Sequence, residues 1–78
     1  MNKTLGMGLT FNGLRVAVSV KFQKYPFHNS RKVVVTVGGL CVFEAKWDVA
    51  GKEYALEALK AIGDEVAELS DALGKVEV

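Results

Sequence analysis

Residues 14–22 read LRVAVSVKF, and this stretch decides the fold class. Its even positions are all apolar, whereas its odd positions carry Arg15, Ala17, Ser19 and Lys21. Successive side chains of a β-strand point to opposite faces of the sheet, so this alternation predicts a strand with one apolar and one polar face. The apolar face should lie against a core, which leaves the other face for solvent or for a partner.

The dipeptide Asn12-Gly13 precedes this strand and predicts a tight hairpin. Asn-Gly suits a type I′ turn because both central positions need positive φ. A two-residue turn places Phe11 opposite Leu14 and fixes the register, so the apolar residues of both strands share one face. The further pairs expected are Leu9–Val16, Met7–Val18 and Leu5–Val20.

Two more strands are predicted at 32–37 and 41–47, around Gly38 and Gly39. A two-residue loop there would bring two charged side chains, Glu44 and Lys46, to the core face. A three-residue loop, 38–40, instead keeps the charges outside and gives the pairs Val37–Cys41, Val35–Phe43 and Val33–Ala45. Because burying an unpaired charge costs far more than one loop residue, we expect the three-residue loop, with Cys41 as a small buried side chain.

After Trp47 the apolar period changes to three or four residues, which predicts an amphipathic helix. Its stripe consists of Leu56, Leu59, Ile62, Val66, Leu69 and Leu73. Asp48 is the expected N-cap, and Gly74 with Lys75 is the expected stop. The stripe crosses Gly63 in phase, so one helix is expected, and Gly63 is the place where it could kink.

These elements predict a single α+β domain over residues 1–78: a four-stranded antiparallel meander with one long C-terminal helix on its apolar face, in the order β-β-β-β-α. A helix of about 24 residues is roughly 36 Å long, whereas strands of seven or eight residues reach only about 25 Å. Unless Gly63 bends the helix, the turns carrying Val66, Leu69 and Leu73 extend past the sheet. We therefore expect a homodimer with these three residues at its interface.

The composition argues against several classes of protein. Hydrophobic residues make up 50% and charged residues 24% of the chain, as in a folded domain. No uncharged stretch reaches the length of a membrane span, and the N-terminal residues lack the apolar block of a secretory signal, so a cytoplasmic location is expected. One cysteine and one histidine cannot build a structural zinc site. We expect no enzyme activity and no cofactor.

The net charge of +1 hides two halves of opposite sign. Residues 1–47 contain seven basic residues and one acidic residue, whereas residues 48–78 contain three basic and eight acidic residues. The polar face of the predicted sheet carries Arg15, Lys21, Lys32 and Lys46 among small side chains. These residues either solvate the sheet and discourage edge pairing, or they bind an acidic partner. We expect binding, because a cationic face attracts and orients such a partner.

The connection before the third strand offers a second candidate for partner binding. It contains Tyr25, Phe27 and His28, flanked by Lys24 and Arg31. The two aromatic side chains either close the end between sheet and helix, or they form a protein-binding hot spot or a stacking platform. One imidazole does not make a catalytic site, so we expect no chemical role for His28.

Two functions fit this chain. Its small size and lack of a catalytic constellation favour a non-catalytic protein-binding module, such as a phage or mobile-element inhibitor that occludes a larger host complex in the manner of anti-CRISPR proteins. The β-β-β-β-α order also resembles, in architecture, the PC4-like and Whirly single-stranded nucleic-acid-binding modules, whose helices form the dimer. That resemblance implies a dimeric nucleic-acid-binding protein that uses the basic sheet face. We expect the first function, because this face lacks aromatic residues for stacking bases.

Overall fold

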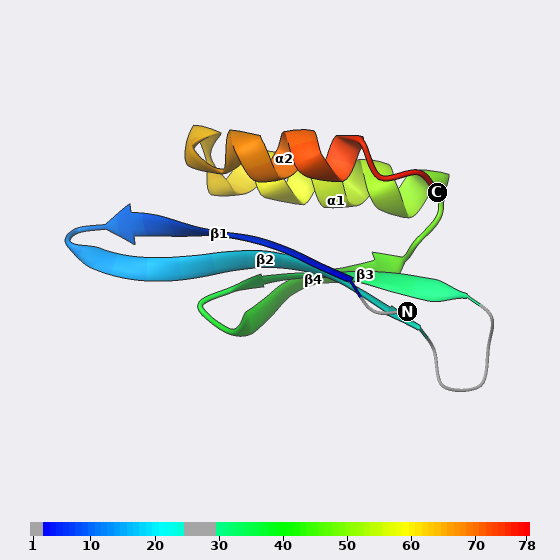
Figure 1. The fold of residues 1–78 in the computed structure, drawn as a ribbon, viewed down its shortest axis with the longest axis horizontal. Coiled ribbons are helices and arrows are strands. Elements are labelled where there is room, and N and C mark those ends of the chain that lie inside the picture. Colours follow the sequence, from blue (N-terminus) through cyan, green and yellow to red (C-terminus); the bar gives the residue numbers. More distant parts are fainter. Residues whose placement is uncertain (1–2, 25–29) are drawn as a thin grey trace.

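A computed structural model describes residues 3–24 and 30–78. One antiparallel sheet has the order β1-β2-β3-β4, formed by β1 (Lys3–Phe11), β2 (Leu14–Lys24), β3 (Arg31–Val37) and β4 (Leu40–Lys46). Two helices, α1 (Val49–Ile62) and α2 (Ala67–Gly74), lie side by side on one face of this sheet (Figure 1). The predicted α+β class and the four-stranded meander are confirmed.

The first hairpin has the predicted register. Asn12 and Gly13 adopt φ angles of 50° and 81°, as a type I′ turn requires. The pairing then continues without a shift from the turn to the far end of β1. The even positions of β2 therefore lie on the helix side of the sheet. Val18, Val20 and Phe22 are buried there and Lys24, at the end of the strand, is exposed, while Arg15 and Lys21 are exposed on the open face.

The second hairpin differs from the prediction in its turn. Gly38 and Gly39 have φ angles of 60° and 85° and form a two-residue turn. The register shifts between Val35 and Thr36, which leaves Val42 as an extra residue in β4. This β-bulge restores the predicted pairs of Val35 with Phe43 and of Val33 with Ala45. The charged residues Glu44 and Lys46 thus stay on the open face, as expected, but a bulge achieves this instead of a longer loop.

The bulge also corrects the position expected for Cys41. This residue is the register partner of Thr36 instead of Val37. Its side chain is exposed, so the expectation that Cys41 is a buried core residue is wrong.

The C-terminal segment is a helical hairpin and not one long helix. The Asp48 side chain accepts a hydrogen bond from the Gly51 amide at 2.7 Å, so the predicted N-cap is confirmed. At Gly63 the backbone adopts φ 139°, and the short 3-10 helix η1 (Asp64–Val66) reverses the chain. α2 then runs back along α1 to the predicted stop at Gly74, which brings the C-terminus near the start of α1 (Figure 1).

This reversal shortens the helical layer so that it covers its own sheet. α1 contacts β3 and β4, and α2 contacts β1. Val66, Leu69 and Leu73 are only 0%, 3% and 0% exposed within the single chain. The overhang that was the reason for expecting them at a dimer interface is therefore not present.

The core lies between the two layers. Its buried members are Leu9, Val18, Val20, Phe22, Val33, Val35, Trp47, Ala55, Leu59, Val66, Leu69 and Leu73. We also expected Val16, Phe43 and Ile62 in this core. Phe43 and Ile62 are half-buried at its margin, whereas Val16, closer to the first hairpin turn, is partly exposed and does not belong to the core. No helix within the described ranges is long and apolar enough to cross a membrane.

Side chains near the start of α1 hold the C-terminal residues in place. Lys52 Nζ donates to the carbonyl oxygens of Gly74 and Val76 at 2.9 and 2.7 Å. Trp47 Nε1 donates to the carbonyl oxygen of Glu77 at 3.4 Å, and the same indole packs edge-on against an aromatic ring of β2. Trp47 thus links the C-terminal residues to the sheet.

Candidate binding surface

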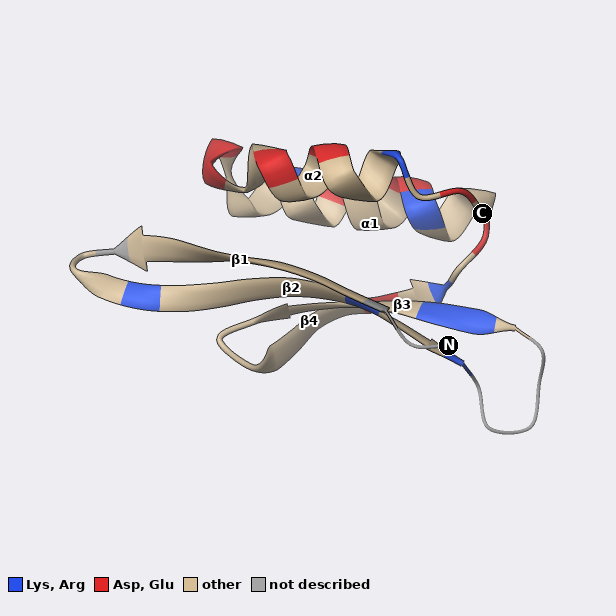
Figure 2. Cartoon of the chain, viewed as in Figure 1, with Lys and Arg blue, Asp and Glu red and all other residues tan. Residues whose placement is uncertain are grey.

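The basic residues predicted on the open face do not form one surface. Lys21, Lys32 and Lys46 gather toward the ends of β2, β3 and β4 that are remote from the hairpin turns (Figure 2). Arg15 lies at the opposite end of β2, beside the first hairpin turn. Lys21 lies six positions after Arg15 along the strand, which corresponds to about 20 Å. The predicted face therefore divides into a cluster and one distant residue.

At the clustered end, like charges face each other across neighbouring strands. Lys32 is the register partner of Lys46 on the open face, and Lys24 is the register partner of Arg31 on the helix side of the sheet, the side that Phe22 and Val33 also face. Like charges directly opposite one another destabilise a sheet, by about 0.2–1 kcal/mol per pair on the scale of cross-strand interactions. We call Lys21, Lys24, Arg31, Lys32 and Lys46 together the basic end.

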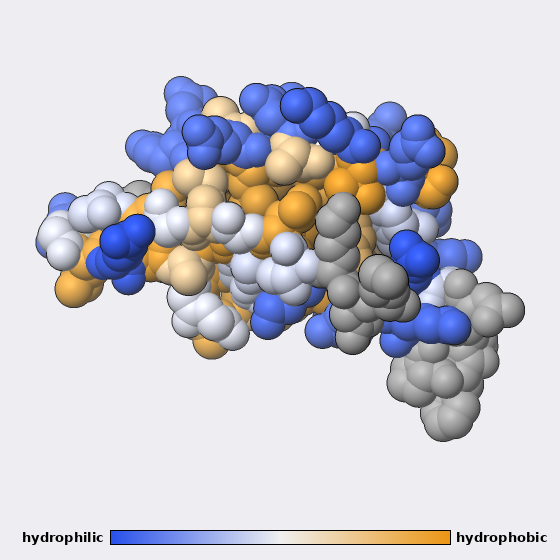
Figure 3. Space-filling view, in the orientation of Figure 1, coloured by the Kyte–Doolittle hydropathy of each residue, from blue (hydrophilic) through white to orange (hydrophobic). Residues whose placement is uncertain are grey.

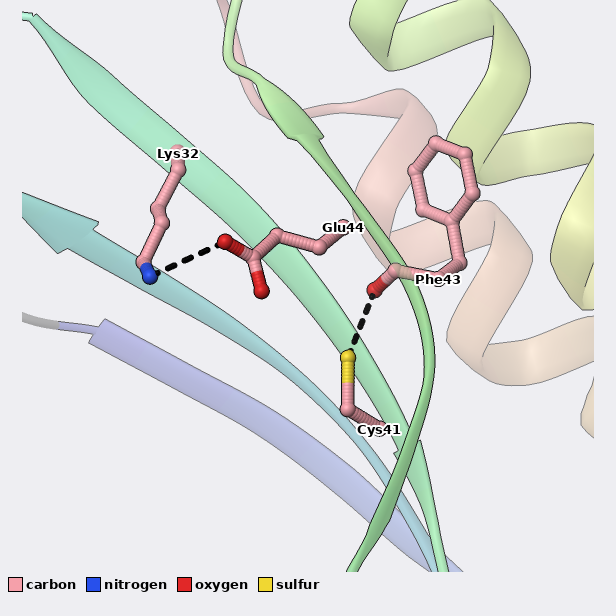
Figure 4. A network of polar contacts seen from close by, with 4 residues as sticks. All are labelled: Lys32, Cys41, Phe43 and Glu44. Atoms are coloured by element: carbon pink, nitrogen blue, oxygen red, sulfur yellow. Dashed lines mark hydrogen bonds and ion pairs between the residues drawn. The ribbon is translucent and has the colours of Figure 1, made fainter.

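Glu44 offsets part of this repulsion. Lys32 Nζ lies 3.1 Å from Glu44 Oε1, and both side chains are partly exposed (Figure 4). An exposed ion pair contributes only about 0–1 kcal/mol, because water screens the charges and both side chains lose freedom. This range is similar to the repulsion expected for one like-charge pair, so the ion pair offsets part of the repulsion at Lys32 and leaves the Lys24–Arg31 pair unaffected.

A shallow, open recess of about 340 Å³ adjoins the basic end. It lies where β3 begins and β4 ends, and it is lined by Ser30, Arg31, Lys46, Trp47, Glu77 and Val78. Two cations, a hydroxyl and an indole ring thus border the recess, together with one acidic residue, Glu77. Such groups suit a carboxylate or phosphate, because charge-assisted hydrogen bonds from cationic donors are stronger than neutral ones.

The middle of the open face carries small side chains and provides fewer charged groups for a partner. The hydroxyls of Ser19 and Thr36 share a hydrogen bond with each other. The Arg15 side chain lies over Gly8, where an added Cβ would come within 3.0 Å of the Arg15 Nε atom. Arg15 is thus laid along the sheet, and Gly8 leaves room for it.

The other sequence candidates lie elsewhere or cannot be placed. Tyr25, Phe27 and His28 lie outside the described residues. Cys41 is exposed on β4, and its Sγ donates to the carbonyl oxygen of Phe43 at 3.5 Å (Figure 4). Within the described parts of the chain, no three His, Cys, Asp or Glu side chains come together as metal ligands.

Sequence reasoning named Lys24 and Arg31 only as flanks of a loop and missed that they pair in the sheet. Their pairing depends on the register between β2 and β3. A tight turn fixes a register, but the longer connection at 25–30 does not. The signal that could have been used is the count of apolar positions in both strands, because aligning Phe22 with Val33 also aligns Lys24 with Arg31.

Known proteins offer no role that could be transferred to this surface. No protein-family model, no curated protein and no solved structure matches the chain.

Proposed function

We propose that the chain is a small non-catalytic protein-binding module that docks its basic end against an acidic surface of a larger protein complex. The observation that carries this proposal is the presence of two like-charge cross-strand pairs, Lys32–Lys46 and Lys24–Arg31. Like charges in register destabilise a sheet, so a partner whose negative charges relieve the repulsion would give these pairs a role. The module would act by covering part of the complex, as a phage inhibitor that occludes a host machine does.

The distribution of charge over the two layers supports an oriented encounter. Acidic residues gather on the helices and basic residues on the sheet (Figure 2). An acidic partner is therefore attracted by one layer and repelled by the other, which favours docking through the sheet. The recess beside Arg31 and Lys46 can then receive a carboxylate.

Single-stranded nucleic acid would meet the same charges, but two observations favour a protein partner. Trp47, the aromatic residue that lines the recess, is only 9% exposed, and the exposed Tyr54 belongs to α1 in the other layer. Base stacking supplies much of the affinity for single strands, and the described part of the basic end offers no exposed ring for it. In addition, the helices fold back on their own sheet, whereas the PC4-like and Whirly arrangement relies on helices that form a dimer.

A stability measurement, which needs no partner, tests whether a like-charge cross-strand pair weakens the sheet. Lys24→Glu converts the Lys24–Arg31 pair into a pair of opposite charges, so we expect the free energy of unfolding to rise by about 0.5 kcal/mol or more. Lys60→Glu makes the same change of charge on α1 and should bring no such gain. Urea unfolding of both variants decides, and a Lys24→Glu protein no more stable than wild type would show that the pair does not weaken the sheet.

A binding measurement tests the surface. The probes are poly-L-glutamate, as a model of an acidic protein surface, and a thymidine oligonucleotide. We expect Arg31→Glu/Lys46→Glu to weaken poly-L-glutamate binding at least tenfold, or about 1.4 kcal/mol. The control Arg15→Glu/Lys60→Glu has the same net charge and should stay within about threefold of wild type on the same affinity scale.

Two outcomes would contradict the proposal. An equal loss in both double variants would mean that binding follows net charge and not the basic end. Tighter binding of the oligonucleotide than of poly-L-glutamate, with an affinity that falls steeply with salt, would assign the basic end to nucleic acid.

A further inference from the structure

The two outer strands of the sheet differ in how they are protected from further pairing. β4 carries a bulge and the charged residues Glu44 and Lys46, which are common means of blocking an edge. β1 has no charged residue and no proline over positions 4–11, and it pairs with β2 without any shift. The sheet therefore ends in a long, regular and uncharged edge at β1, which is the type of edge that invites another strand.

The backbone groups that face this edge follow from the hydrogen-bond ladder. The Gly38 amide donates to the Ala17 carbonyl oxygen at 2.8 Å, so the backbone groups of Ala17 point away from β1. In an antiparallel ladder, bonded and non-bonded pairs alternate, and Gly8 is the register partner of Ala17. Every second residue of β1, counted from Gly8, therefore directs its N–H and C=O to the free edge. These residues are Thr4, Gly6, Gly8 and Thr10.

The sequence of this edge is a palindrome. Residues 4–10 read TLGMGLT in both directions, with Met7 at the centre. An antiparallel pair of identical strands, related by a two-fold axis at Met7, would place every residue opposite one of its own kind. The pairs would be Thr4–Thr10, Leu5–Leu9, Gly6–Gly8 and Met7–Met7. All outward-pointing residues of one strand then meet outward-pointing residues of the other.

We propose that two copies of this chain pair their β1 strands antiparallel about Met7 and form one continuous sheet with all helices on the same face. The palindrome indicates that the strand pairing with β1 is the β1 strand of a second copy, because the two-fold symmetry supplies the same sequence in the reverse direction. Opposed threonines are a favourable cross-strand pair, and opposed glycines put no side chain in the way.

The apolar surface beside β1 supports this pairing. Leu5 and Met7 are only half-buried and pack at the margin of the core. An apolar band follows the seam between the helices and the sheet (Figure 3). Pairing would place Leu5 against Leu9 and Met7 against Met7 of the other copy, so the cores of the two copies would become continuous.

Hydrogen exchange in the wild-type chain tests the pairing directly. The amides of Gly6 and Gly8 face solvent in a monomer and should exchange at the rate of free amides, whereas the dimer should slow them at least about tenfold. Analytical ultracentrifugation gives the mass in the same buffer. A monomer at about 0.1 mM with fast exchange at both glycines would overturn the proposal.

A matched pair of variants at Gly6 tests the same point through dimer affinity. Proline at this position removes an outward N–H and no bond to β2, so the chain itself should still fold. The space accepts a Cβ, because the nearest atom, the Val18 carbonyl oxygen, lies 3.5 Å away. We expect Gly6→Pro to raise the dimer dissociation constant at least tenfold and Gly6→Ala to change it less than about threefold.

A further variant keeps the test decisive if Gly6→Pro does not fold. Met7→Lys places two like charges opposite each other at the two-fold axis, and it should also raise the dissociation constant at least about tenfold. A folded Gly6→Pro or Met7→Lys protein that dimerises like wild type would overturn the proposal.

Salt separates this dimer from an association of the basic end of one copy with the acidic helices of another. At about 0.5 M salt the electrostatic screening length is only about 4 Å, so an association driven by charge should dissociate. The strand-paired dimer rests on backbone hydrogen bonds and apolar contacts and should persist. Dissociation on addition of salt would contradict it, and this result is independent of whether the basic end binds a protein.

Discussion

Gly51 lies in the first turn of α1, close to the chain that leaves β4. A Cβ at this position would overlap the carbonyl oxygen of Lys46, and the Gly51 amide also donates to the side chain of the N-cap Asp48. In an unobstructed helix, alanine is favoured over glycine by about 1 kcal/mol. Here the close approach of a backbone atom reverses that preference, because the connection from β4 cannot move without disturbing the helix cap.

We therefore expect Gly51→Ala to lower the free energy of unfolding by about 1–3 kcal/mol, the range typical of overpacking. Gly74→Ala is the matched control, because a Cβ there meets no atom within 4 Å, and it should be neutral or slightly stabilising. Urea unfolding compares the two. A Gly51→Ala protein as stable as wild type would show that the backbone at Lys46 can move away from the added Cβ without a loss of stability.

The end of α2 depends on a single side chain of α1. Lys52 donates to the carbonyl oxygen of Gly74, the last residue of α2, and to that of Val76 just beyond it. Lys52→Met keeps the aliphatic stem and removes both bonds, so we expect a loss of about 1 kcal/mol in stability and faster amide exchange in the last turn of α2. Lys60→Met removes a charge from the same helix without touching these carbonyls. Equal losses in both variants would show that charge, and not the two bonds, is responsible.

At the scale of the elements, the two hairpins show how far the sequence could predict the structure. Asn12-Gly13 demands one turn type, and that turn alone sets every pair in the first hairpin. Gly38-Gly39 also suits a two-residue turn, but the charges of Glu44 and Lys46 then require a correction. A longer loop and a bulge both satisfy that requirement, and only the folded chain shows that the bulge was used.

The apolar stripe of residues 56–73 did not predict the chain reversal at Gly63, for a related reason. Both helices present their apolar residues to the same sheet, so the spacing from Leu59 through Ile62 to Val66 stays helical across Gly63. A periodic pattern reports which side chains are buried, but it does not report the direction of the chain. The basic end was hidden in a similar way, because the face of each lysine follows from parity, while its neighbours follow from the β2–β3 register.

Across the whole molecule, the two proposed surfaces lie on different parts of the sheet. The basic end is built from β2, β3 and β4, whereas the palindromic edge belongs to β1 alone. A dimer through β1 would therefore leave both basic ends uncovered and would offer two binding surfaces to one extended partner. Linking two sites in this way raises overall avidity without any new contact, provided that the partner can reach both.

Gly63 holds the two helices against one sheet through a backbone conformation, φ 139°, that residues with a side chain rarely adopt. Gly63→Ala would favour helical geometry at this point and join α1 and α2 into one straight rod. In a straight rod Leu73 would lie about 21 Å beyond Leu59 along the helix axis, so α2 would leave the part of the core that it now covers beside α1. We expect α2 to cross to the sheet of a second chain, so that the variant forms a domain-swapped dimer. Spin labels on α2 and β1 would then be close between chains and distant within a chain, whereas a Gly63→Ala protein with both labels close within one chain would show that the reversal survives the loss of glycine.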